Sequence, residues 1–324
     1  ILAGCAARAV PPGPGLPPEA ARLVPGSDEA PGFLIADDGY RLPLRAWLPA
    51  EEPPRAVLLA LHGFNDYSHA FAQPGAALAA RGIAVFAYDQ RGFGATAHAG
   101  LWAGRQTLTG DLATATRLLR ARYPGTPLYL LGSSMGGAVV LAAEARAEPP
   151  PVDGLILAAP AVWARDTQPW YQRAGLWLMV RLAPGLRPSG RGLEIQASDN
   201  IEMLRALGRD PLVLKDARFD TLGGLVDLMD AALSAASKVR RPTLLLYGEK
   251  DEIIPQVPVE LLWRKLPAAT PARYVVYPDG WHMLLRDLQA AVVIDDIAAW
   301  IADPAGSLPS VGEARAHETR AAAD

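Results

Sequence analysis

Short, almost continuous apolar runs recur along the middle of the chain and alternate with longer amphipathic segments. The apolar runs have the length of strands and cover residues 56–61, 83–88, 127–132, 154–159, 243–248 and 272–277. Strands that are apolar throughout are typical of a parallel sheet covered by helices on both faces. Segments with helical periodicity cover residues 70–81, 107–123, 135–147 and 286–302. The pattern predicts an α/β fold with a mostly parallel, doubly wound sheet.

Other segments fall outside this alternation. Residues 33–47 contain Asp-Gly between two strand-like runs, which predicts an antiparallel hairpin at the start of the sheet. Residues 161–236 contain no clear strand and are predicted to form a helical insert over the sheet. The insert divides the core of the fold into residues 32–160 and 237–303. The large apolar residues of the insert are Trp163, Trp170, Tyr171, Trp177, Leu178 and Met179. The ends of the chain, residues 1–31 and 304–324, are predicted to form a Pro/Gly-rich linker and a flexible tail.

Composition and charge narrow the possible functions. Half of the 324 residues are apolar and a fifth are charged, which is the balance of a globular protein. The net charge of −3 and the pI near 6.0 provide no basic field for nucleic acid. The single cysteine, Cys5, excludes an internal disulfide, and no His, Cys, Asp or Glu cluster has the spacing of metal ligands. No apolar run reaches the roughly 18 residues of a membrane-spanning helix. We therefore expect no nucleic-acid partner, metal or cofactor.

The stretch Y-L-L-G-S-S-M-G-G-A, residues 129–138, contains the pattern G-x-S-x-G at Gly132, Ser134 and Gly136. It lies directly after a predicted strand and before a predicted helix, which is the context that a nucleophile elbow requires. Glycines are needed because only residues without a side chain let neighbouring segments pass closely at such a turn. The turn would hold Ser134 at the carboxyl edge of the sheet, where open α/β sheets bind ligands. Ser133 is the adjacent alternative, but the spacing favours Ser134.

A serine hydroxyl needs a base, normally a histidine oriented by a carboxylate. The chain has five histidines. His317 is in the predicted tail, His69 and His98 are on early loops, and His62 belongs to an H-G-F-N loop with another expected role. His282, between the last predicted strand and the final helix, is therefore the predicted base.

The carboxylate should follow the serine and precede the histidine in chain order. The stretch Y-G-E-K-D-E-I-I-P, residues 247–255, begins at the end of a predicted strand and has three acidic residues in its turn. We choose Asp251, because a short acid directly after the strand can reach the imidazole. Glu249 is the second choice and Asp166, after the preceding strand, the third.

The oxyanion that forms when a serine attacks a carbonyl needs fixed N–H donors. One is expected from the backbone of Met135, directly after the nucleophile. The other is expected from the loop L-H-G-F-N-D, residues 61–66, after an early strand. Phe64 is the predicted donor there, and Gly63 allows the close approach.

These motifs resemble those of α/β-hydrolases of the monoacylglycerol lipase and lysophospholipase type, which are also grouped with serine aminopeptidases. The likeness spans about residues 33–303 and runs through L-H-G-F-N-D (61–66), Y-D-Q-R-G-F-G-A-T (88–96), Y-P-G-T-P-L-Y-L-L-G-S-S-M-G-G-A (123–138), L-L-L-Y-G-E-K-D-E-I-I-P (244–255) and Y-P-D-G-W-H (277–282). The resemblance implies an α/β-hydrolase fold in which the insert is a cap that shapes an acyl pocket. It also implies ester cleavage without a cofactor, with Ser134, Asp251 and His282 as triad and Phe64 and Met135 as oxyanion donors.

The chain departs from the family at two positions beside the expected site. Relatives commonly have histidine where this chain has Ser133, and often glycine where it has Asn65. A monoacylglycerol or lysophospholipid is the expected substrate. A peptidase or acyltransferase on the same scaffold, or a non-catalytic ligand-binding protein, is the alternative. The presence of all three triad residues argues against a binding protein.

The chain opens I-L-A-G-C, which resembles a bacterial lipobox ending at Cys5. The resemblance implies that the first four residues are the remnant of a signal peptide and that Cys5 is lipidated. Two or more acyl chains suffice for stable anchoring at a membrane surface. Ala6, in place of an acidic residue, resembles the signal for outer-membrane retention. We therefore expect a lipid-anchored protein of the bacterial cell envelope, with a cytoplasmic protein as the alternative.

The anchor hypothesis predicts that Cys5→Ser releases the full-length protein from the membrane fraction of its host, because the acyl chains have no other point of attachment. Fractionation followed by immunoblotting measures this. Wild-type protein that is already in the soluble fraction, with no change in Cys5→Ser, would contradict the anchor.

Overall fold

The computed structural model describes residues 7–15, 17, 21–26, 31–188 and 195–310, and within these residues nine strands form one sheet. The strand order is β1-β2-β3-β5-β4-β6-β7-β8-β9. The six strands β4 to β9 pair with one another in parallel. Strands β1, β2 and β3 are antiparallel to their neighbours. Their bounds are β1 (Arg22–Val24), β2 (Gly32–Ile35), β3 (Arg41–Trp47), β4 (Ala56–Leu61), β5 (Ile83–Tyr88), β6 (Leu128–Ser133), β7 (Gly154–Ala158), β8 (Thr243–Gly248) and β9 (Ala272–Tyr277). The predicted mostly parallel α/β sheet and its initial hairpin are confirmed.

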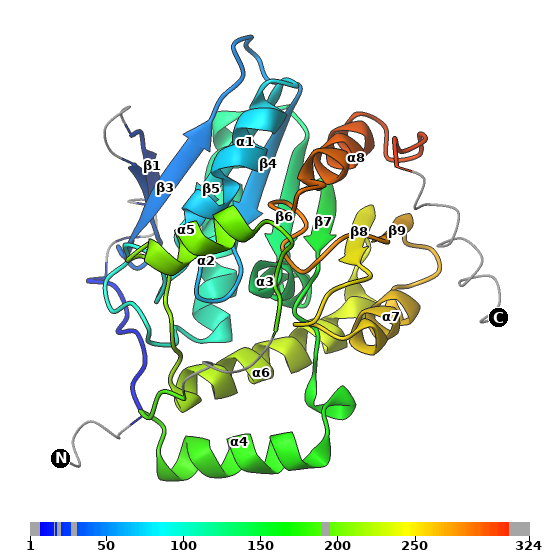
Figure 1. Cartoon of the computed structure of the whole chain (residues 1–324). Helices are drawn as coiled ribbons and strands as arrows, with labels where there is room; N and C mark the ends of the chain where they lie inside the picture. The colour runs from blue at the N-terminus through cyan, green and yellow to red at the C-terminus, as the bar shows by residue number, and fades with distance from the viewer. Residues whose placement is uncertain (1–6, 16, 18–20, 27–30, 189–194, 311–324) are drawn as a thin grey trace.

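Helices cover both faces of the sheet (Figure 1). Their bounds are α1 (Ala72–Ala79), α2 (Arg105–Arg122), α3 (Met135–Ala143), α4 (Trp170–Leu182), α5 (Ile201–Arg209), α6 (Phe219–Ala235), α7 (Gln256–Lys265) and α8 (Ala290–Ala302). Successive side chains of a strand point to opposite faces, so each parallel strand contributes to two cores. In β4, Val57, Leu59 and Leu61 join the core under α2, α3 and α6. The alternate residues of β4 join the second core, under α1 and α8.

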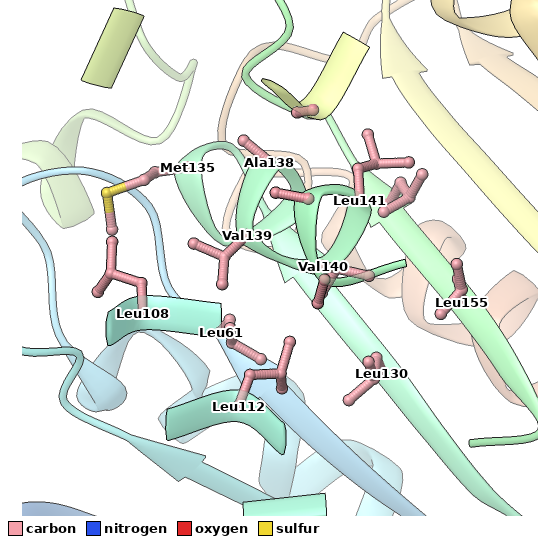
Figure 2. Close-up of a cluster of buried hydrophobic side chains, with 14 of the residues drawn as sticks. Leu61, Leu108, Leu112, Leu130, Met135, Ala138, Val139, Val140, Leu141 and Leu155 are labelled. Carbon is pink, nitrogen blue, oxygen red and sulfur yellow. The ribbon is translucent and has the colours of Figure 1, made fainter. Parts of the chain in front are cut away.

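The core beneath α3 positions the expected nucleophile. Figure 2 shows Val139 and Val140 of α3 on the side of the helix that faces Leu61 and Leu130 of the sheet, with Leu108 and Leu112 of α2 nearby, whereas Ala138 and Leu141 lie on the other side of the helix. All nine residues of α3 are buried. Burying a leucine or valine side chain contributes about 1.5–3 kcal/mol, so this packing holds the start of α3 firmly in place.

The structure differs from the sequence prediction near both ends of the chain. Part of the predicted linker forms β1, whose register with β2 pairs Leu23 with Leu34. Three backbone N–H groups of the proline-rich stretch are also bonded: Val10 N–H donates to Trp102 O, Gly13 N–H to Asp38 Oδ2 and Gly15 N–H to Asp38 O. At the other end, Leu308 is buried in the second core. These segments are ordered by partners distant in sequence. Cys5 and Ala6 lie outside the described residues.

The segment between β7 and β8 is helical but does not form a single layer. Nine residues of α6 are buried, and this helix packs directly on α3 as part of the core. Figure 1 shows α6 between α4 and the sheet, with α4 outermost. The predicted insert, residues 161–236, therefore includes a core helix at its end. Helix α7 was missing from the prediction, and it tolerates Pro258 because the first turn of a helix does not use that N–H group.

Candidate active site

Ser134 lies on the turn between β6 and α3 with φ 50° and ψ −116°. Positive φ is strained for a residue with a side chain, and costs on the order of 1–3 kcal/mol. A Cβ atom at Gly136 would lie 2.1 Å from the carbonyl oxygen of Leu61, so a larger residue there would collide with the end of β4. The turn is held by the Ser134 N–H, which donates to Ala158 O at 3.0 Å, and by the Ala161 N–H, which donates to Ser134 O at 2.9 Å. The surroundings thus impose the strained conformation on Ser134.

The loop after β4 approaches this serine closely. A Cβ atom at Gly63 would lie 3.3 Å from Ser134 Cβ and 3.9 Å from Ser134 Oγ. The preceding His62 is fully buried, and its Nε2 accepts the Gln90 N–H at 2.9 Å. Its Nδ1 must then donate to Gly63 O, at 2.8 Å. Burial lowers the pKa of His62, so this neutral imidazole is a structural part of the loop.

The loops after β8 and β9 bring Asp251 and His282 together. Asp251 Oδ2 lies 2.8 Å from His282 Nδ1. The Asp251 side chain is fully buried, and its Oδ1 accepts the N–H groups of Ile253 and Ile254 at 2.8 and 2.9 Å. A carboxylate bonded to Nδ1 holds the proton on that nitrogen and leaves Nε2 able to accept one. The arrangement can serve a general base.

A cavity of about 220 Å³ lies at this edge of the sheet, and both Ser134 and His282 are among its lining residues. Gly63 and Phe64 line it from the loop after β4. Its apolar side chains are Phe64, Ala70, Phe71, Ile253, Met283 and Leu285, and its polar ones include Ser133, Asp66 and Arg286. The strands that precede these loops are parallel, so their carboxyl ends meet at one edge. The cavity is therefore small and mostly apolar, and its wall includes both Ser134 and His282.

The backbone N–H groups of Phe64 and Met135 are both placed near Ser134. Met135 is the first residue of α3, so its N–H has no intrahelical acceptor. Phe64 follows Gly63 directly and packs edge-on against Phe93, with ring centroids 5.5 Å apart. Within the described ranges, no hydrogen bond to another residue occupies either N–H.

The other candidate residues that the structure describes are exposed or, in the case of Ser133, lie outside the strained turn. Glu249 and Asp166 are exposed. His69 is exposed and stacks on Tyr67, His98 is exposed on its own loop, and His317 lies outside the described residues. Ser133 lines the cavity but ends β6, one residue before the strained turn.

The large apolar residues of the insert do not line the cavity. In α4, Trp170, Tyr171 and Trp177 are 76%, 60% and 57% exposed. No residue of α4 is buried. The resemblance implied that the insert shapes an acyl pocket, but in the structure these side chains of α4 are turned outward.

One ion pair at the cavity could not be expected from the sequence. Arg286 donates to Asp66 across 220 positions of the chain. Their side chains are only 16% and 8% exposed. The pair connects the loop of Phe64 to the loop of His282. In the sequence, the only indication of this ion pair was that each of its residues lies next to a predicted motif.

Neither a metal site nor a membrane-spanning helix is found in the part of the chain that the structure describes. The described residues contain no group of three or more His, Cys, Asp or Glu side chains placed to hold a metal ion. Among the helices in this part of the chain, none is long and apolar enough to cross a membrane.

The sheet order, the strained serine turn and the covering helices define an α/β-hydrolase. Residues 52–289 match the family model described as serine aminopeptidase, S33, and the chain belongs to this family. A monoacylglycerol lipase of Mycolicibacterium smegmatis is 27% identical over 271 residues, covering 81% of this chain and 93% of that protein.

Solved structures share the fold at lower identity. A soluble variant of monoglyceride lipase from Saccharomyces cerevisiae, in complex with a substrate analog, superimposes with a TM-score of 0.69 at 21% identity and covers 83% of this chain and 94% of that chain. A thermostable carboxyl esterase from Bacillus coagulans, in complex with glycerol, gives a TM-score of 0.69 at 20% identity and covers 83% of this chain and 96% of that chain.

Proposed function

We propose that this carboxylic ester hydrolase cleaves monoacylglycerols or lysophospholipids through an acyl-enzyme on Ser134. One observation carries the proposal: His282, which is bonded to Asp251, lines the same cavity as the serine on the strained turn. A nucleophile, a base and a group that orients the base are the components of serine hydrolysis.

In the first step, Ser134 Oγ attacks the ester carbonyl carbon while His282 Nε2 takes the hydroxyl proton. The tetrahedral intermediate collapses, its bond to the alcohol oxygen breaks, and the imidazolium returns the proton to the leaving alcohol. Water then attacks the acyl-enzyme with His282 again as base, and the carboxylic acid leaves as Ser134 regains its proton. Asp251 holds the imidazole in place throughout, and its own position is fixed by hydrogen bonds from two backbone N–H groups.

The negative oxygen of each tetrahedral intermediate is stabilised by the N–H groups of Phe64 and Met135. Donors that are already fixed when charge develops need no reorganisation, and one such donor is worth about 10²–10³ in kcat. Gly63 permits this arrangement, because its missing side chain leaves room beside Ser134 Cβ.

A lipid-like substrate suits two surfaces of the molecule. The cavity beside Ser134 is lined mainly by apolar side chains, which favour an apolar acyl group. The exposed aromatic face of α4 provides an apolar contact for substrate held in a micelle or bilayer. The monoacylglycerol lipase of M. smegmatis supports the same substrate class.

A substrate panel tests this proposal. We expect turnover of monoacylglycerols and lysophospholipids with kcat/KM at least about tenfold above that for a p-nitrophenyl acetate standard, because each buried methylene adds binding energy. Matched amides and an alcohol acceptor are assayed in parallel by mass spectrometry. Faster amide cleavage, or transfer of the acyl group to the alcohol in preference to water, would instead indicate a peptidase or an acyltransferase.

A further inference from the structure

A second buried carboxylate supports the loop of His282. Asp287 is 4% exposed and lies five positions after the histidine. Its Oδ2 accepts the backbone N–H of Trp281, the residue before His282, at 2.8 Å. Its Oδ1 accepts the hydroxyl of Ser198, at 2.6 Å. Ser198 is completely buried and belongs to the segment between α4 and α5. Asp287 therefore joins the histidine loop to the insert.

The segment 196–200 makes further bonds to the same region. The Met283 N–H, directly after His282, donates to Ala197 O at 3.0 Å, and Asn200 Nδ2 donates to Arg286 O at 3.0 Å. The Leu288 N–H donates to Asp199 Oδ1 at 2.9 Å. At the acid loop, the Gln196 N–H donates to Glu252 Oε2 at 2.6 Å. This segment is thus bonded to the loops that carry both His282 and its partner Asp251.

Neither donor to Asp287 is charged, so the pair of bonds does not cancel its negative charge. Burial is the largest influence on this carboxyl and raises its pKa, while the bonds from Ser198 and Trp281 lower it. His282 also lowers the pKa of Asp287, so the two groups interact electrostatically. A group placed in this way can influence both the position and the basicity of the histidine.

We propose that Asp287 is a positioning residue for His282, and that its bond to Ser198 makes segment 196–200 a fixed part of the active site. The inference rests on the proposed function, because it assumes that His282 is the base. The part of the insert that holds Ser198 acts here as a brace for the histidine loop.

Several other charged groups surround the histidine loop. Asp251 is bonded to His282 directly, and Arg286 is paired with Asp66 at the cavity. Asp199 approaches Asp287 from the insert and raises its pKa. A change at Asp287 alters only one of these charges, so its effect on His282 can be measured against an otherwise constant background.

Two variants test the proposal in the full chain. Asp287→Asn removes the charge and leaves only one side-chain oxygen to accept a hydrogen bond. Ser198→Ala removes the bond to the insert and keeps the charge. We expect kcat to fall about tenfold or more in each, with KM changed less than about twofold, because a misplaced base slows chemistry more than binding. We also expect the acid limb of the kcat/KM profile to move to lower pH in Asp287→Asn, since the imidazolium loses a favourable charge.

A measurement that needs no turnover separates this inference from the proposed function. Nuclear magnetic resonance of histidines labelled with ¹⁵N gives the pKa of His282 directly in each protein. We expect this pKa to be lower in Asp287→Asn than in wild type, because the substitution removes a nearby negative charge. The matched control is Asp295→Asn, the same change at an exposed acid that pairs with Arg81 on the surface. The control is expected to leave the His282 titration unchanged.

The outcomes are distinct. A lower His282 pKa in Asp287→Asn supports the positioning role, even if wild-type protein proves inactive on esters. An unchanged His282 pKa and pH profile would overturn it, even if activity falls. If Asp287→Asn does not fold, Ser198→Ala decides: a lower kcat with unchanged KM supports the brace, and wild-type kcat contradicts it.

Discussion

Replacing Ser134 by alanine is expected to lower kcat for ester hydrolysis by about 10⁴-fold or more, because no acyl-enzyme can form without the hydroxyl. The substitution keeps the Cβ atom at the strained turn, where φ is 50°. Thermal unfolding should therefore change little. The measurement is turnover of a short p-nitrophenyl ester, together with intact mass after treatment with a fluorophosphonate.

Wild-type protein should gain a single phosphonate adduct, and Ser134→Ala should gain none. The matched control is Ser133→Ala, which removes the adjacent hydroxyl and should keep the adduct. An adduct that persists in Ser134→Ala but is absent from Ser133→Ala would move the nucleophile by one residue. A folded wild-type protein with neither adduct nor turnover would instead favour a ligand-binding protein.

Asp251→Asn is expected to lower kcat by about 10⁴-fold, because an amide cannot hold the His282 proton on Nδ1 as a carboxylate does. The asparagine retains an oxygen for the N–H groups of Ile253 and Ile254, which now bond to Asp251 Oδ1. Its amide nitrogen would then face the imidazole and favour the tautomer with the proton on Nε2. That tautomer cannot take the serine proton. The measurement is kcat for the same ester, with circular dichroism to verify folding.

Glu249→Gln is the matched control, since Glu249 is the exposed acid two residues earlier on the same turn. It should keep kcat within about twofold of wild type. If Glu249→Gln lost activity and Asp251→Asn retained it, the assignment of the orienting carboxylate would be wrong, whatever the geometry at His282.

The parallel strands were predictable because each is apolar on both faces. Burial in two cores requires that composition, and β4, β5, β6, β7 and β8 are buried along nearly their whole length. The hairpin of β2 and β3 was predictable because Gly39 has φ 80° in an Asp-Gly turn, a conformation that favours glycine. The apolar composition of the strands and the glycine of the turn were thus sufficient to predict these elements.

Two features that escaped prediction, strand β1 and the place of helix α6 in the core, depend on distant partners. β1 is three residues long, lies between prolines and exists through its pairing with β2. Helix α6 contains Gly223 and Gly224, which weaken a helical signal, yet Cβ atoms there would lie 2.9 Å from Val180 and 2.3 Å from Trp102. Close packing with other segments, which no local pattern encodes, explains these glycines.

For the candidate site, the sequence alone determined which residue types stand at the ends of which strands. The G-x-S-x-G spacing, the position of a single suitable histidine and the acidic turn after a strand each follow from local rules of chain geometry. The tertiary structure decided which of three acids meets the histidine, which way α4 turns its aromatic face, and that Ser198 and Asp287 support His282. Those outcomes depend on contacts between segments far apart in the chain, where burial and hydrogen-bond geometry decide which of several candidate partners meet.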